Sequence, residues 1–184
     1  MNVRRIVAGN DSAGRSVFLS DDVVPHSHVY QHLPGQAHAR VWFNAGPPST
    51  SVPSEETTSE TGPIFPDVGG ASFIVVQYAP DSVAMDPGFD GAQAGAEFAQ
   101  YLPDLASHMD PDEPGMHRTQ SVDFGIVLDG EIWLELDGGE QRQLTRGDTV
   151  VQLAGRHAWR NKSDQPATIA FVLTGASAAD AATG

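Results

Sequence analysis

The fold of this chain is decided by residues 115–161, which contain two histidines 40 positions apart. The stretch begins Gly115-Met116-His117-Arg118-Thr119-Gln120-Ser121-Val122-Asp123 and, after a hairpin, ends Arg156-His157-Ala158-Trp159-Arg160-Asn161. Side chains alternate between the two faces of a strand, so His117, Thr119 and Asp123 are predicted to share one face. Trp159 follows His157 on the face of a second strand. Two imidazoles and a carboxylate that converge would make a metal site with open positions.

The spacing of these residues resembles two motifs of the cupin superfamily. In the first motif, Gly115 and His117 stand near the start, Asp123 takes the place of a Glu, and Gly130 follows after six residues. In the second motif, a Gly at position 147 comes first, and His157 and Asn161 come last. In finer detail, the stretches 114–117, 127–131 and 157–161 resemble small bacterial single-domain cupins.

Four positions depart from the family pattern. Thr119 stands where the second histidine of the first motif belongs, and Asp123 is one methylene shorter than the usual Glu. Leu153 replaces a proline, and Gly155 is one residue too close to His157. These departures affect the chemistry of the site more than the fold.

The resemblance implies an all-β fold, a double-stranded β-helix (jelly-roll) barrel with one short helical segment packed outside. The expected organisation is a barrel over residues 71–175, preceded by N-terminal strands and a mobile Pro/Ser-rich excursion within residues 1–70. Residues 176–184 are predicted to form a flexible tail. The chain shows no internal repeat, so one barrel is expected rather than two fused ones.

The pattern of apolar residues predicts the other elements. Strands are expected over 15–20, 39–44, 71–78 and 168–173, because these runs are rich in β-branched and aromatic residues. Residues 90–109 have apolar positions at helical spacing, with Pro103 breaking the run into two short helices or a kink. This helical segment is expected to pack over the barrel, with a lid across its mouth as the alternative. Residues 46–70 contain few apolar anchors, so this stretch is expected to be the most mobile internal segment.

Composition excludes several classes of function. The 184 residues carry a formal net charge of −14 and no basic stripe, so binding to nucleic acid is not expected. The chain has no cysteine, which excludes disulfides and thiolate chemistry. No apolar run reaches the ~20 residues of a membrane span, and the N-terminus lacks the apolar core of a signal peptide. A cytoplasmic protein with no membrane partner is therefore expected.

The candidate site residues follow from the two motifs. His117, His157 and Asp123 are predicted to bind one divalent metal ion and to carry the chemistry, with Gln120 as a weaker oxygen ligand. The competing possibility is a barrel that has lost its metal, because the hydroxyl of Thr119 is a poor ligand. Three residues are predicted to contact the substrate: Trp159, Thr119 and Arg156. Arg118 and Arg160 are expected at the surface, and a second histidine group is formed by His26, His28 and His32.

The predicted function is a metal-dependent cupin enzyme that acts on a small molecule in the barrel. Fe, Zn, Mn and Ni are not distinguished by the sequence. One candidate reaction is oxygenation, and the other is a redox-neutral dehydration, isomerisation or cyclisation. A non-catalytic ligand sensor without metal is the alternative from a different class. The family resemblance and the apolar N-terminal strands also predict a homodimer.

Overall fold

The structure, a computed structural model, describes residues 1–177. Its strands are β1 (Arg4–Asn10), β2 (Ser16–Val23), β3 (His26–Val29), β4 (Ala37–Asn44), β5 (Ala71–Tyr78), β6 (Ser121–Asp129), β7 (Glu131–Leu136), β8 (Gln141–Thr145), β9 (Thr149–Leu153), β10 (His157–Arg160) and β11 (Ala167–Gly175). Its helices are η1 (Asp81–Met85), α1 (Gly91–Tyr101), α2 (Pro103–Ser107) and η2 (Asp137–Gly139). The tail predicted for residues 176–184 lies outside the described residues from position 178 onward.

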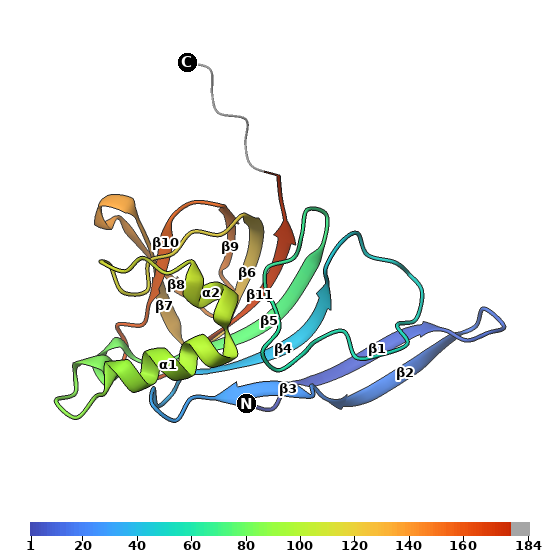
Figure 1. The fold of residues 1–184 in the computed structure, drawn as a ribbon, viewed down its shortest axis with the longest axis horizontal. Coiled ribbons are helices and arrows are strands. Elements are labelled where there is room, and N and C mark those ends of the chain that lie inside the picture. The colour runs from blue at the N-terminus through green and yellow to red at the C-terminus, as the bar shows by residue number, and fades with distance from the viewer. Residues whose placement is uncertain (178–184) are drawn as a thin grey trace, which may run out of the picture.

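Two antiparallel sheets form the barrel (Figure 1). The larger has six strands in the order β3-β4-β5-β11-β6-β9, and the smaller has three in the order β10-β7-β8. Strand β11 lies between β5 and β6 and is paired with both. The jelly-roll prediction is therefore confirmed, because the strands form two antiparallel sheets that pack against each other around one core.

Strand β6 shows how the sequence sets the two faces of the large sheet. Alternate residues from Ser121 to Val127 are buried, whereas Phe124, Ile126 and Leu128 are exposed. The strand ends at Gly130, whose φ of 75° lies in the left-handed region. A Cβ atom at that position would lie 2.9 Å from the Cα of Ala167, so the turn into β7 requires glycine.

The two faces of the large sheet are covered differently. The inner face packs against the small sheet in a core that includes Val127, Ile132 and Ile169. On the outer face, a smaller cluster around Val75 and Ala170 packs against the N-terminal segment. The outer face therefore has its own partial cover, and the rest of its apolar side chains stay exposed.

The helical segment breaks where the sequence predicts. Pro103 occupies the first turn of α2, where its missing N–H has no helical partner to lose. Helix α1 begins after Asp90, whose side chain accepts hydrogen bonds from the N–H groups of Ala92 and Gln93. Both helices lie beside the barrel strands (Figure 1). The apolar stripe faces inward, since Leu102 is 2 % exposed and belongs to the main core.

The excursion at residues 46–70 is irregular, but its second half is fixed to the barrel. Ile64 is 5 % exposed and belongs to the main core. The carboxylate of Asp104 accepts hydrogen bonds from the N–H groups of Ile64 and Phe65. The guanidinium of Arg40 donates to the carbonyls of Gly62 and Pro63. The prediction that this excursion has few residues in the core is thus wrong for its second half. It agrees with the structure for residues 47–55, which are exposed.

The N-terminal region forms a hairpin rather than the single strand predicted. Strand β1, which the sequence analysis missed, pairs with β2 along its whole length. The hairpin extends away from the barrel (Figure 1). Across residues 1–177, no helix is both long and apolar enough to cross a membrane.

Candidate active site

A cavity of about 690 Å³ lies inside the barrel and extends under the two α-helices. Its walls come from β5, β6, β9, β10 and β11, from α1 and α2, and from Ile64 and Phe65 of the excursion. Five of the predicted site residues line the cavity: His117, Thr119, Asp123, His157 and Trp159. The two motifs therefore meet in one place, as their spacing predicts.

His117 and His157 lie side by side in this cavity. Their backbones form an isolated antiparallel bridge, with N–H to O distances of 2.9 and 3.0 Å in the two directions. Their ring centroids are 4.4 Å apart. The bridge joins His117 to the first residue of β10, and this backbone pairing holds the two imidazoles together.

Both imidazoles have the same internal hydrogen bond. The Nδ1 of His117 is 3.0 Å from the carbonyl oxygen of Gly115, and the Nδ1 of His157 is 2.8 Å from that of Gly155. A carbonyl only accepts, so each Nδ1 carries the proton and each Nε2 has a lone pair. No group within residues 1–177 is hydrogen-bonded to either Nε2. This is the tautomer that metal-binding histidines use.

Burial keeps both rings neutral. It lowers the pKa of His117 to about 4, and the neighbouring His157 adds a smaller lowering effect. Burial also lowers the pKa of His157, against a small opposing effect of the Gly155 carbonyl. At neutral pH both rings are therefore acceptors at Nε2, the form required to bind a cation.

Asp123 faces the cavity with one oxygen lacking a protein partner. Its Oδ1 is buried without a hydrogen bond in the described chain, whereas Oδ2 accepts one from the Thr119 hydroxyl at 3.4 Å. Thr119 in turn accepts from Ser121 at 3.1 Å. Burial raises the pKa of Asp123, and the two hydroxyls oppose that effect only in part. A buried oxygen without a partner is a site for a ligand, a water or an ion.

Only two of the three predicted ligands are arranged to bind a divalent ion. Both imidazoles are neutral, have no partner at Nε2 in the described chain and are held in place by hydrogen bonds to backbone carbonyls. Over residues 1–177, however, no three His, Asp or Glu side chains are grouped closely enough to hold an ion together. Asp123 therefore shares the cavity without completing a three-residue site in this arrangement.

Two of the three predicted substrate contacts lie in the cavity wall. Trp159 packs edge-on against Phe171, with ring centroids 5.4 Å apart, and contributes to the core as well as to the cavity. Thr119 is 3 % exposed and lines the cavity near Asp123.

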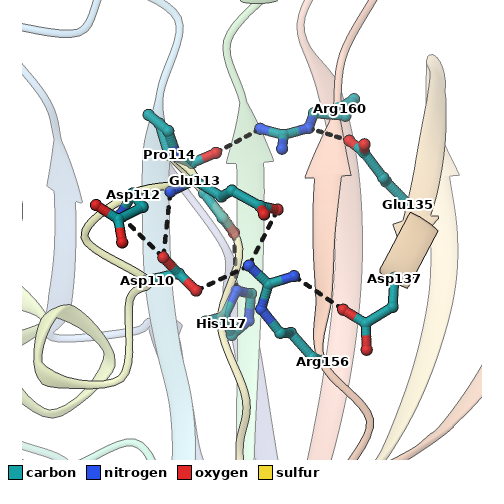
Figure 2. A network of polar contacts seen from close by, with 10 residues as sticks. Asp110, Asp112, Glu113, Pro114, His117, Glu135, Asp137, Arg156 and Arg160 are labelled. Carbon is teal, nitrogen blue, oxygen red and sulfur yellow. Dashed lines mark hydrogen bonds and ion pairs between the residues drawn. The ribbon is translucent and has the colours of Figure 1, made fainter. Parts of the chain in front are cut away.

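Arg156, the third predicted contact, is bound to the protein itself. Figure 2 shows its guanidinium between Asp110, Glu113 and Asp137, at distances of 2.8, 3.0 and 2.8 Å. These carboxylates raise its pKa, and it is not among the residues that line the cavity. The protein's own carboxylates occupy its donors in this structure, so its role in binding a substrate carboxylate stays a prediction.

Arg160 also differs from the prediction. It was expected at the surface, yet it lines the cavity. Its Nε donates to Glu135 at 2.5 Å and its Nη1 to the carbonyl of Pro114 at 2.6 Å (Figure 2). Both arginines thus fasten the loop at residues 110–116, which leads into His117.

The remaining predicted ligands lie apart from the cavity. Gln120 is exposed and does not line it, since the alternation that turns Thr119 and Ser121 inward turns Gln120 outward. The three N-terminal histidines do not converge. His26 is paired with Thr58 at 2.9 Å, whereas His28 bonds Glu97 at 2.8 Å and His32 is exposed.

The sequence analysis missed several residues of the site. Tyr78, at the end of β5, lines the cavity, and burial together with the nearby Asp123 raises the pKa of its phenol. Gln152 lines it from β9, directly opposite Asp123 in the strand register. A register argument between the predicted strands could have found Gln152, but the position of Tyr78 depends on how the sheet curves.

Comparison with known proteins agrees with this architecture. Residues 107–173 match the Cupin_2 family, described as a cupin domain. This part of the chain is similar to a cupin domain, and the antiparallel sheets around it are consistent with a jelly-roll cupin barrel. The matched segment contains both histidines, Asp123 and the strands β6 to β10.

The relatives found are fungal. The "Cupin-domain-containing oxidoreductase fogC" of Aspergillus ruber is 28% identical over 177 residues, covering 93% of this chain and 71% of that protein. The "Cupin-domain-containing oxidoreductase srdB" of Neurospora crassa is 28% identical over 170 residues, covering 92% and 71%. The "Phomopsin biosynthesis cluster protein C'" of Diaporthe leptostromiformis is 62% identical over 48 residues. That match spans 26% of this chain and only 25% of that relative. The resemblance to bacterial cupins stays a prediction.

Solved structures that align with this chain have low sequence identity to it and low TM-scores. A putative ethanolamine utilization protein from Salmonella typhimurium covers 96% of this chain, with 9% identity and a TM-score of 0.41. A structural-genomics protein from Rhizobium leguminosarum covers 77%, with 14% identity and a TM-score of 0.40.

Proposed function

We propose that this cupin barrel is an oxidoreductase that acts on a small organic molecule beside His117 and His157. The relatives named as cupin-domain-containing oxidoreductases support a cupin enzyme in general and favour oxidation over a redox-neutral reaction. The observation that carries the proposal is the pair of neutral, backbone-fixed imidazoles that meet in one cavity.

The two histidines would hold a divalent ion through their Nε2 atoms, with Nδ1–H donated to Gly115 and Gly155. When bound, such an ion supplies Lewis-acid or one-electron redox chemistry. Asp123 has a separate role in the proposal, because its side chain lines the same cavity and its buried Oδ1 has no protein partner. There it accepts a proton from a substrate hydroxyl or returns one, as a general base or acid within hydrogen-bond reach.

The first test measures metal. The purified chain, free of an affinity tag, is loaded with Fe(II) without air, dialysed and analysed by plasma emission. We expect about one ion per chain, lost in His117→Ala and in His157→Ala but kept in the control His32→Ala, an exposed histidine. Loss of the ion in the control alone would move the metal site to the N-terminal histidines and contradict the proposal.

The second test measures the reaction. The loaded protein is incubated in air with a panel of small organic molecules, and products are analysed by mass spectrometry. A gain of oxygen atoms or a loss of two hydrogens, absent in the two histidine variants, is the expected result. Products of unchanged mass, or products that have lost only water, would indicate the redox-neutral class instead. Tight ligand binding without any product would indicate a sensor.

A further inference from the structure

The volume of the cavity indicates the size of the ligand that it can bind. At about 690 Å³ it falls within the range of ~300–1,000 Å³ that surrounds drug-sized ligands. A single-ring acid would leave most of that space to water against apolar walls, which is unfavourable. A ligand that fills the cavity is therefore larger than a single-ring molecule.

The walls of the cavity are divided by polarity. His117, His157 and Asp123 come together with Thr119 and Gln152 around the start of β6, the end of β9 and the start of β10. The cover on the helical side is apolar, with Phe98 of α1 and Leu105 of α2. Ile74 and Phe171 of the large sheet line the cavity as well. An occupant that matches these walls has one polar end and an apolar body.

Polar residues elsewhere in the wall are bonded to the protein. Gln36 accepts a hydrogen bond from the N–H of Ala79, and Asp81 accepts one from the N–H of Asn161. The amide of Asn161 donates to the carbonyls of Tyr78 and Gln165. These groups support the backbone at the edge of the cavity, so they do not add a second polar end.

Away from the histidine pair, the described wall of the cavity has no free cationic side chain for an anion. Among its lining residues Arg160 is the only Arg or Lys, and it is bonded to Glu135 and to the Pro114 carbonyl. Two carboxyl groups, Asp81 and Asp123, line the same space. A carboxylate or phosphate buried away from the histidine pair would therefore be desolvated without an opposite charge, which is costly. The net charge of −14 adds a repulsive field.

We propose, building on the oxidoreductase proposed above, that the substrate is a neutral, largely apolar molecule of drug size. Its hydroxyl or carbonyl end faces the histidine pair and Asp123. Its apolar body, an alkyl chain or fused rings, lies between the helices and the large sheet. A small single-ring acid does not match the size of this cavity.

The test is a binding comparison that needs no turnover. Isothermal titration of the full chain, with and without chelator treatment, uses three probes: 4-heptylphenol, phenol and 4-heptylbenzoate. We expect heptylphenol to bind at least about tenfold more tightly than phenol, since burial of about two methylene groups alone accounts for that factor. In the chelator-treated chain it should also bind at least about tenfold more tightly than heptylbenzoate, because the carboxylate is buried without a counter-ion. Because the comparison measures binding only, an enzyme proposal that fails in the reaction assay leaves this result readable.

A pair of variants locates the binding. Ala94 is buried and lines the cavity from α1, whereas Ala96 on the same helix is exposed and does not line it. Ala94→Phe should fill the space and weaken heptylphenol binding about tenfold or more, and Ala96→Phe should leave it unchanged, with circular dichroism as the check on folding. Equal or tighter binding of heptylbenzoate to the chelator-treated chain, or full heptylphenol affinity in a folded Ala94→Phe protein, would overturn the proposal. If Ala94→Phe does not fold, the comparison of the three probes on the unaltered chain is the test of the proposal.

Discussion

Thr119 is the residue at which this site departs most from the pattern of its fold. It occupies the place of a histidine, is buried, and uses its hydroxyl to connect Ser121 to Asp123. The hydroxyl is a poor ligand for a first-row ion, so two histidines are left to hold one.

Replacing Thr119 therefore tests the two-histidine site. Thr119→His should add a third imidazole in the same cavity and tighten metal binding by roughly tenfold or more, about 1.4 kcal/mol. Thr119→Val, of similar shape and without a ligand atom, is the matched control. Metal content after a chelator challenge measures the difference. If the histidine variant retains no more metal than the valine variant, the ion is not bound beside position 119.

Glu56 is a second residue of interest, because its contribution to folding stability should depend on pH. Its carboxylate binds both terminal nitrogens of Arg5 at 2.9 and 2.7 Å and accepts hydrogen bonds from Thr58. The hydrogen bonds from Arg5 are the largest cause that lowers its pKa from 4.5 to about 2. Because the pKa of Glu56 is lower in the folded protein than the value of 4.5 expected in the unfolded chain, the ionised carboxylate stabilises the fold fully above about pH 4.5. This stabilisation is lost as the pH falls toward about 2.

Glu56→Gln should accordingly lower the free energy of unfolding at neutral pH by ~1 kcal/mol or less, because the pair is only partly buried. The deficit should shrink below about pH 4.5. Urea unfolding at several pH values measures it, with Glu55→Gln as the neighbouring control. A deficit that stays constant down to about pH 2 would show that the charge of Glu56 is not what stabilises the excursion.

At the scale of elements, the loop at residues 110–116 is held by arginines from the barrel. Arg156 binds Asp110 and Glu113 of the loop, and Arg160 binds its Pro114 carbonyl (Figure 2). The loop ends at His117, whose Nδ1 is bonded to Gly115 within it. The position of the first histidine thus depends on these ion pairs.

Arg156→Gln should loosen this loop. Hydrogen exchange of residues 110–116 should become faster than in the unaltered protein, with little change elsewhere in the barrel. Arg118→Gln, at an exposed position next to the same segment, serves as the control. If the Arg156 variant instead keeps its exchange pattern and weakens binding of a carboxylate ligand, Arg156 contacts substrate after all.

Local patterns were sufficient to predict most elements and the histidine pair. The alternation along β6 and the proline at position 103 act within a few residues, so the sequence shows them directly. The partners of Arg156 could not be predicted, because Asp110 is 46 residues away from it and Asp137 is 19. The same reason hid the anchoring of Ile64 and the extent of the cavity, which depend on how distant segments pack.

At the scale of the whole molecule, the outer face of the large sheet is apolar and exposed. Val172 of β11 pairs in register with Phe73 of β5 and with Phe124 of β6, which in turn pairs with Val151 of β9. All four are exposed, so they form an apolar row across four strands. A contiguous row of this kind is typical of a surface that another protein covers.

We therefore expect a homodimer, with this row in its interface. Light scattering at micromolar concentration should give about twice the chain mass of 19.5 kDa. Phe124→Asp should halve the mass, whereas Val68→Asp, at an exposed position in the excursion, should leave it unchanged. A monomer mass for the unaltered chain would contradict the prediction.

The central position of β11 also bears on how the protein is made. β11 fills the gap between β5 and β6, yet it follows both of them in the chain. On a ribosome, the edges of β5 and β6 stay open while residues 130–175 are translated, which takes roughly 2 to 9 seconds at the usual ~5–20 residues per second. Open strand edges recruit other chains. A transcript cut before β11 would therefore yield an aggregating product rather than a partly active one, and the nascent barrel is a natural client for chaperones that shield strand edges.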